Sequence, residues 1–253
     1  MRRKSQVDIA PTIARMLGIS IHEPDGMPIE EVAGWRCKNA ILVIVDSLGY
    51  DLYGWLEPEL KSIPAIASHG LMLGAKAVSD HTSPAIASIL SGLLPQHHGI
   101  FDTESAKRSP LLSIPEIASS NGLRSAVVME KGGAEVYEGL IDFIGEVPRV
   151  LSPRAFDLEI CRLSMEALSS MPRLLVSYFI GIDKAAHNGL SSDGFREAAI
   201  AIDHYVGEIA GAAQPETMMI VVGDHPIHAG QFKRNRDPYC VALIIGGKRL
   251  PSP

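Results

Sequence analysis

Residues 41–49 read ILVIVDSLG, an apolar run that ends in Asp46 and continues into a turn containing Gly49. Similar β-branched, apolar runs lie at 125–129, 174–180, 218–222 and 240–245. None of them alternates apolar with polar residues, so each is predicted to be a strand buried on both faces of a sheet. Weaker strand candidates lie around 71–78 and 140–144.

Helical patterns separate these runs. The clearest covers 192–210, where Phe195, Ala199, Ile202, Val206 and Ile209 recur at helical spacing. Other helices are predicted at 84–90, 114–120 and 154–169, and a shorter one from about residue 10 to a C-cap at 18. The alternation predicts an α/β protein with three αβα layers and a mostly parallel central sheet. With no repeat or long linker, residues 1–253 are expected to form a single domain.

Composition restricts the class of protein. The chain is 46% hydrophobic and 21% charged, as in ordinary globular proteins, and its formal charge of −6 argues against a nucleic-acid binder. The three cysteines, Cys37, Cys161 and Cys240, match neither a zinc ribbon nor a disulfide framework. No apolar stretch follows the basic start at 1–4, and no run is long enough to span a membrane. A soluble, cytoplasmic protein is therefore expected.

Residues of the types that bind metal ions follow the predicted strands or a neighbouring loop. They are Asp46, Thr82, the pair Asp183 and His187, and the group Asp224, His225 and His228. Sites in open α/β sheets form beyond the carboxyl ends of the strands, so these side chains are predicted to meet.

Each cluster has an alternative interpretation. Taken alone, Asp46 and Thr82 are better explained as residues at helix starts. The helix after Thr82 is predicted to begin at Pro84, so that the hydroxyl faces the positive helix end. Asp183 and His187 share a face if their loop takes a helical turn. The 224–228 group favours a metal site; its ligand types suit Zn²⁺, with Mn²⁺ or Fe²⁺ as alternatives.

Together, the clusters resemble the alkaline phosphatase superfamily, which includes nucleotide pyrophosphatase/phosphodiesterases, phosphopentomutase, cofactor-independent phosphoglycerate mutase and sulfatases. The resemblance implies an alkaline phosphatase-like core that binds two divalent metal ions. It implies hydrolysis of a small phosphate monoester or diester through a phosphothreonine on Thr82, with Ser83 as the rival nucleophile. One metal ion would be bound by Asp46, Thr82, Asp224 and His225, and the other by Asp183, His187 and His228.

Other branches of the superfamily fit less well. Sulfatases carry Cys or Ser at the nucleophile position and Arg two residues beyond the proline, where this chain has Thr82 and Ile86. Mutases carry a large cap domain, whereas predicted strands and helices fill most of the stretch between Ile100 and Asp183. A hydrolase without a large cap is therefore expected. A phosphomutase-like phosphoryl transferase and a non-catalytic metal-binding module remain alternatives.

Residues 5–19, SQVDIAPTIARMLGI, resemble the segment that normally ends these proteins, yet here they come first. We interpret this as a circular permutation in which 1–36 correspond to the usual C-terminal segment. The hypothesis requires 8–18 to pack near the 240–245 strand, either within one chain or by exchange in a homodimer.

Overall fold

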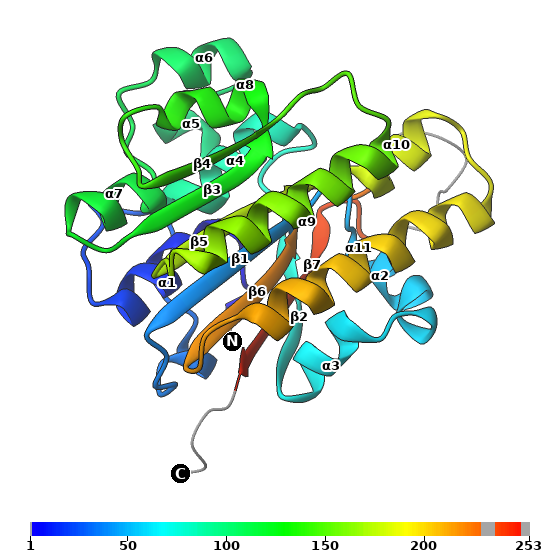
Figure 1. The fold of residues 1–253 in the computed structure, drawn as a ribbon, viewed down its shortest axis with the longest axis horizontal. Helices are drawn as coiled ribbons and strands as arrows, with labels where there is room; N and C mark the ends of the chain where they lie inside the picture. Colours follow the sequence, from blue (N-terminus) through cyan, green and yellow to red (C-terminus); the bar gives the residue numbers. More distant parts are fainter. Residues whose placement is uncertain (1, 229–235, 249–253) are drawn as a thin grey trace.

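The computed structural model describes residues 2–228 and 236–248. In this part of the chain a seven-stranded sheet has the order β2-β7-β6-β1-β5-β3-β4 (Figure 1). Its strands are β1 (Asn39–Val45), β2 (Gly70–Lys76), β3 (Ser125–Glu130), β4 (Phe143–Val147), β5 (Leu174–Phe179), β6 (Thr217–Gly223) and β7 (Cys240–Lys248). β7 runs antiparallel to both of its neighbours, and the other pairings are parallel. The predicted mostly parallel sheet is confirmed, and the two weaker candidates correspond to β2 and β4.

Helices cover both faces of the sheet (Figure 1). α2 (Tyr50–Leu56), α3 (Ser62–Ser68), α9 (Pro153–Ser169) and α11 (Ser192–Ala212) pack on one face, and α1 (Ile9–Leu17), α4 (Thr82–Ser91) and α7 (Ile114–Ser120) on the other. Successive residues of β1 enter opposite apolar clusters: Ile41 and Val43 enter one, Leu42 and Ile44 the other. Because both faces are buried, the strand lacks polar alternation.

Shorter elements complete the layers. They are the helices α5 (Pro95–His98), α6 (Thr103–Arg108), α8 (Lys131–Ala134) and α10 (Gly181–His187), and the 3₁₀ turns η1 (Gln6–Asp8), η2 (Glu30–Val32), η3 (Glu57–Glu59) and η4 (Glu135–Tyr137). The stretch between Ile100 and Asp183 is built from α6, α7, β3, α8, β4, α9 and β5, which leaves no large cap domain among the described residues. Across the same residues, no helix combines the length and the apolar character needed to cross a membrane.

The prediction that the helix after Thr82 begins at Pro84 is wrong. α4 begins at Thr82, and His81, with extended backbone, is its N-cap. Proline is tolerated two residues further in because the first-turn N–H groups of a helix have no acceptor within the helix. Thr82 is thus the first residue of the helix itself.

The N-terminal segment packs on the face of the sheet that carries α4. Ile9 and Ile13 of α1 share an apolar cluster with Val241 and Leu243 of β7. Ser5 forms an isolated parallel bridge with Lys76 of β2. The packing that the permutation hypothesis requires is therefore present within one chain, while the rearranged chain order itself stays a prediction.

Candidate metal centre

The predicted site residues meet at one edge of the sheet because of strand direction. β6, β1 and β5 are parallel neighbours, so their carboxyl ends lie side by side. β2 points the same way as β6, since both are antiparallel to β7, and the loop that leaves β2 leads to Thr82. The four predicted clusters thus converge on the same edge.

The first group of potential ligands consists of Asp46, Asp224 and His225, which are 3%, 0% and 1% exposed. The His225 Nε2 atom lies 3.3 Å from Asp46 Oδ1 and 3.5 Å from Asp224 Oδ2. The Thr82 hydroxyl is 3.4 Å from the same nitrogen. Ser83 and Thr82 both line a cavity that opens beside this group. The structure therefore places the Thr82 hydroxyl against this buried group.

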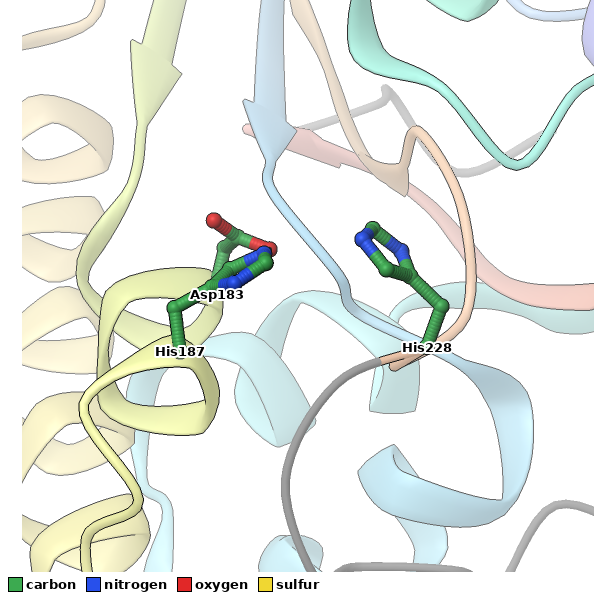
Figure 2. A group of neighbouring side chains, drawn as sticks. All are labelled: Asp183, His187 and His228. Atoms are coloured by element: carbon green, nitrogen blue, oxygen red, sulfur yellow. The ribbon is translucent and has the colours of Figure 1, made fainter.

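The second group consists of Asp183, His187 and His228. α10 puts Asp183 and His187 four residues apart on one helical face, with 3.4 Å between Nε2 and Oδ1. Figure 2 shows the imidazole of His228 facing this pair from the loop that follows β6. The His228 ring centroid is 5.3 Å from that of His187 and 4.7 Å from that of His225, so the two groups adjoin.

Burial and crowded carboxylates raise the pKa values of two candidate ligands. Burial raises the pKa of Asp46 well above its usual range and that of Asp224 to about 7, and neighbouring carboxylates add to both shifts. Within the described residues, Asp46 Oδ1 and Asp224 Oδ2 accept no hydrogen bond, although His225 Nε2 lies close to both. Burial, and then His225, lowers the pKa of His228, which favours the neutral imidazole that binds metals. Unsatisfied carboxylate oxygens beside imidazoles fit a divalent cation such as Zn²⁺.

Two further residues shape the site although the sequence did not single them out. Ser47 adopts a left-handed backbone (φ 64°) and is fully buried. Its N–H donates to Asp224 Oδ1 at 2.9 Å, and its hydroxyl lies 3.0 Å from Asp183 Oδ1 and 3.3 Å from His225 Nδ1. The Tyr178 hydroxyl donates to Asp46 Oδ2. The only signals were a serine directly after Asp46 and a hydroxyl within a buried apolar run.

Two side chains outside the ligand groups hold the segments that carry them. Fully buried Gln6 donates through Nε2 to the carbonyls of Gly223 and Asp224, and its Oε1 accepts from the N–H of Val78. It thereby ties the end of β6 to the loop that leads to Thr82. Asp157 of α9 accepts the N–H groups of residues 180 and 181, where α10 begins.

Two protein-family models match this chain over adjoining stretches. The sulfatase model matches residues 38–138, and the type I phosphodiesterase/nucleotide pyrophosphatase model matches residues 117–238. A search of curated proteins finds no match to the chain.

Solved structures share the fold at low sequence identity. Phosphonoacetate hydrolase from Sinorhizobium meliloti has a TM-score of 0.61 and 16% identity, over 74% of this chain and 56% of the hydrolase. A protein in the alkaline phosphatase superfamily from Vibrio parahaemolyticus has a TM-score of 0.61 and 14% identity, over 98% of this chain and 69% of that protein. Murine ectonucleotide pyrophosphatase/phosphodiesterase 5 has a TM-score of 0.59 and 17% identity, over 74% and 57%. This chain thus spans little more than half the length of the first and third.

Proposed function

This chain belongs to the alkaline phosphatase superfamily, and on that basis we propose that it is a metal-dependent phosphoric ester hydrolase with Thr82 as its nucleophile. The observation that carries the proposal is the Thr82 hydroxyl, 3.4 Å from His225 in one group of potential ligands, with a second group adjoining it. This arrangement suits phosphoryl transfer to a hydroxyl.

We assign the residues to two divalent cations, with Zn²⁺ expected and Mn²⁺ as the alternative. Asp46, Asp224 and His225, with Thr82, would hold one ion. The other would be held by Asp183, His187 and His228. Bound cations of this kind lower the pKa of a hydroxyl and neutralise charge that develops on a transferring phosphoryl group.

The chain itself supplies the nucleophile and its orientation. Thr82 is the first residue of α4, where the backbone N–H groups of Thr82 and Ser83 have no acceptor within the helix and can bind phosphoryl oxygens. In the proposed first step, a bond forms between the Thr82 oxygen and phosphorus while the bond to the ester oxygen breaks, and the alcohol leaves with a proton. Water then attacks the phosphothreonine, which restores the hydroxyl and releases phosphate from a monoester substrate or a phosphate monoester from a diester. The net reaction consumes one water for each ester cleaved.

Sulfate esters are the neighbouring substrate class, because the sulfatase model covers the part of the chain that contains Thr82. Phosphate is favoured since the nucleophile position holds Thr82 instead of the Cys or Ser of sulfatases, and Ile86 stands where they have Arg.

The proposal is tested by assaying wild type, Thr82→Ala and Ser83→Ala on p-nitrophenyl phosphate, bis-p-nitrophenyl phosphate and p-nitrophenyl sulfate with added Zn²⁺ or Mn²⁺. Bound metal is measured in parallel by elemental analysis. We expect metal-dependent turnover of a phosphate ester that falls on the order of 10³-fold or more in Thr82→Ala. Ser83→Ala is the matched control. Loss in Ser83→Ala alone would reassign the nucleophile, and turnover unaffected by metal removal and by both substitutions would refute the proposal.

We also propose that residues 1–36 correspond to a segment that ends other members of the superfamily. The sulfatase match begins at residue 38 and the phosphodiesterase match at residue 117, so this segment lies outside both. A rearranged chain, in which a flexible linker and residues 1–36 follow residues 37–253, should fold and bind zinc like the wild type. A rearranged chain that is unfolded by circular dichroism, with several linker lengths, would count against the idea.

A further inference from the structure

A cavity of about 750 Å³ opens from the candidate metal centre. Asp46, Thr82, Asp183 and His228 line it, and α4 forms one of its walls. That wall consists of positions 82, 83, 86, 87 and 90, which form one stripe of the helix. The stripe is polar at Thr82 and Ser83 and apolar at the other three positions. From Thr82 to Leu90 the helix rises about 12 Å, at 1.5 Å for each residue. Along this length the wall changes from polar side chains, which suit a phosphoryl group, to apolar ones, which suit an apolar chain.

The other walls carry further apolar side chains, beside polar ones such as Thr103, Ser109 and Glu116. They come from the segment after α6, from η4 and from the loops around them, and include Ile100, Leu111, Leu112, Val136, Leu140 and Leu151. Leu112 and Leu140 are 53% and 48% exposed although they line the cavity. Large apolar side chains left in contact with water beside a site are a feature of surfaces that bind an apolar ligand.

The lysine and arginine side chains that line the described part of the cavity are already paired. Each lysine or arginine that lines it contacts a carboxylate: Lys107 with Glu135, Arg149 with Glu130 and Lys184 with Asp183. The carboxylate of Glu116 accepts both the N–H and the hydroxyl of Ser113. The described part of the cavity therefore offers no set of unpaired cations for a second phosphate, and away from the metal centre its dominant chemistry is apolar.

We propose that the organic group of the substrate is an extended apolar chain that lies along α4, beside Ile86 and Ala87 and against Leu112, which lines the same cavity. This inference rests on the proposed function, since the phosphoryl group is placed at Thr82. It goes further by choosing a phosphate ester of a lipid-like alcohol over the ester of a sugar or a nucleoside. A polar sugar or base would leave its hydrogen-bonding groups against apolar walls.

The test is a series of p-nitrophenyl phosphates esterified with methyl, butyl or octyl groups, together with the corresponding monoalkyl phosphates. The p-nitrophenyl ester of thymidine 5′-phosphate serves as a polar diester for comparison. We expect kcat/KM to rise about threefold to fourfold for each methylene that enters the cavity, and the octyl ester to be preferred over the nucleotide ester. Equal rates for methyl and octyl esters, or preference for the nucleotide, would overturn the inference while leaving the hydrolase proposal in place.

Substitutions locate the effect. Leu112→Ser should lower the octyl-to-methyl ratio about fivefold, because roughly half of a leucine side chain becomes covered by the bound chain. Ala87→Leu places a larger side chain in the cavity beside α4 and should lower the same ratio. The matched control is Leu158→Ser, an equally exposed leucine (55%) on α9 outside the cavity, and it should leave the ratio unchanged. A ratio that responds to none of the cavity variants contradicts the placement.

Binding separates this inference from the proposed function. Calorimetry with zinc-loaded Thr82→Ala measures affinity for methyl, butyl and octyl phosphate without turnover. Affinity that increases with chain length supports the apolar cavity even if no ester is hydrolysed, in which case only the hydrolase proposal fails. Affinity independent of chain length refutes the cavity assignment whatever the turnover.

Discussion

A carboxyl group that contacts none of the predicted metal ligands should contribute strongly to the pH dependence of stability. Asp157 is 3% exposed on α9 and accepts the N–H groups of Ile180 and Gly181 at 2.9 and 3.0 Å. Burial outweighs these two hydrogen bonds and raises its pKa from 3.8 to about 7. A shift of about 3 pKa units corresponds to about 4 kcal/mol of coupling between folding and protonation.

The sign follows from which state holds the proton. Between about pH 4 and pH 7 the folded protein keeps a proton on Asp157 that the unfolded chain has released. The free energy of unfolding therefore falls as pH rises through this window and levels off above it. Asp157→Asn removes this titration. We expect the variant to gain about 4 kcal/mol relative to wild type between pH 4 and pH 8.

The measurement is urea unfolding of the metal-free protein, followed by circular dichroism at half-unit pH steps. Titration of Asp46 and Asp224 occurs in both proteins and largely cancels in the difference. Ser164→Ala is the matched control on the same helix, because it removes a 2.7 Å hydrogen bond to Ser177 but no ionisable group. Its cost should be about 1 kcal/mol at every pH. If Asp157→Asn also gives a constant difference, the carboxylate is ionised throughout and the reasoning about burial is wrong.

Three further predictions concern the metal centre and its supports. Gln6→Ala leaves two buried carbonyls and one part-buried N–H without their partner and should lower the free energy of unfolding by about 3 kcal/mol; an unchanged urea midpoint would contradict this. Ser47→Ala removes the hydroxyl that joins the two ligand groups and should weaken zinc binding about tenfold in a competition titration with a chromophoric chelator; equal affinity would show that this contact is dispensable. Zinc should raise the melting temperature more at pH 8 than at pH 5.5, because Asp224, with its pKa of about 7, must lose its proton before it binds; an equal rise at both pH values would refute this.

The strands and the location of the site could be predicted because both depend on local patterns. Apolar, β-branched runs without alternation identify strands covered on both faces, and the sheet has that burial at Ile41, Leu42 and Val43. The placement of the site follows from strand direction. Asp46, Asp183 and Asp224 come soon after three strands that proved to be parallel neighbours. The rule that sites form beyond the carboxyl ends of parallel strands was therefore enough to predict that these residues, far apart in the sequence, lie close together.

Other features depend on contacts that leave no local signal. Nothing in the periodicity of 240–245 shows that β7 is antiparallel, because a strand buried on both faces looks the same in either direction. Ser47, with its left-handed backbone, donates hydrogen bonds to Asp224, directly after β6, and to Asp183 of α10. Both acceptors are far from Ser47 in the sequence. Asp157 is one of many polar residues on a surface-facing helix until the fold brings it against the start of α10. The start of α4 was misplaced because proline is permitted anywhere in a first helical turn.

The supports of the site also bear on how it would acquire metal. Three ligand-bearing regions are held by groups outside the two ligand sets: α10 by Asp157, the end of β6 by Gln6, and Asp224 and Asp183 by Ser47. These contacts, together with the apolar clusters on the two faces of the sheet, require no metal ion. Binding should therefore fill a site that is already arranged, unlike a zinc finger, which is unfolded without its metal. The crowding of the buried carboxylates, which raises the pKa of Asp46, is the feature that a bound cation would relieve.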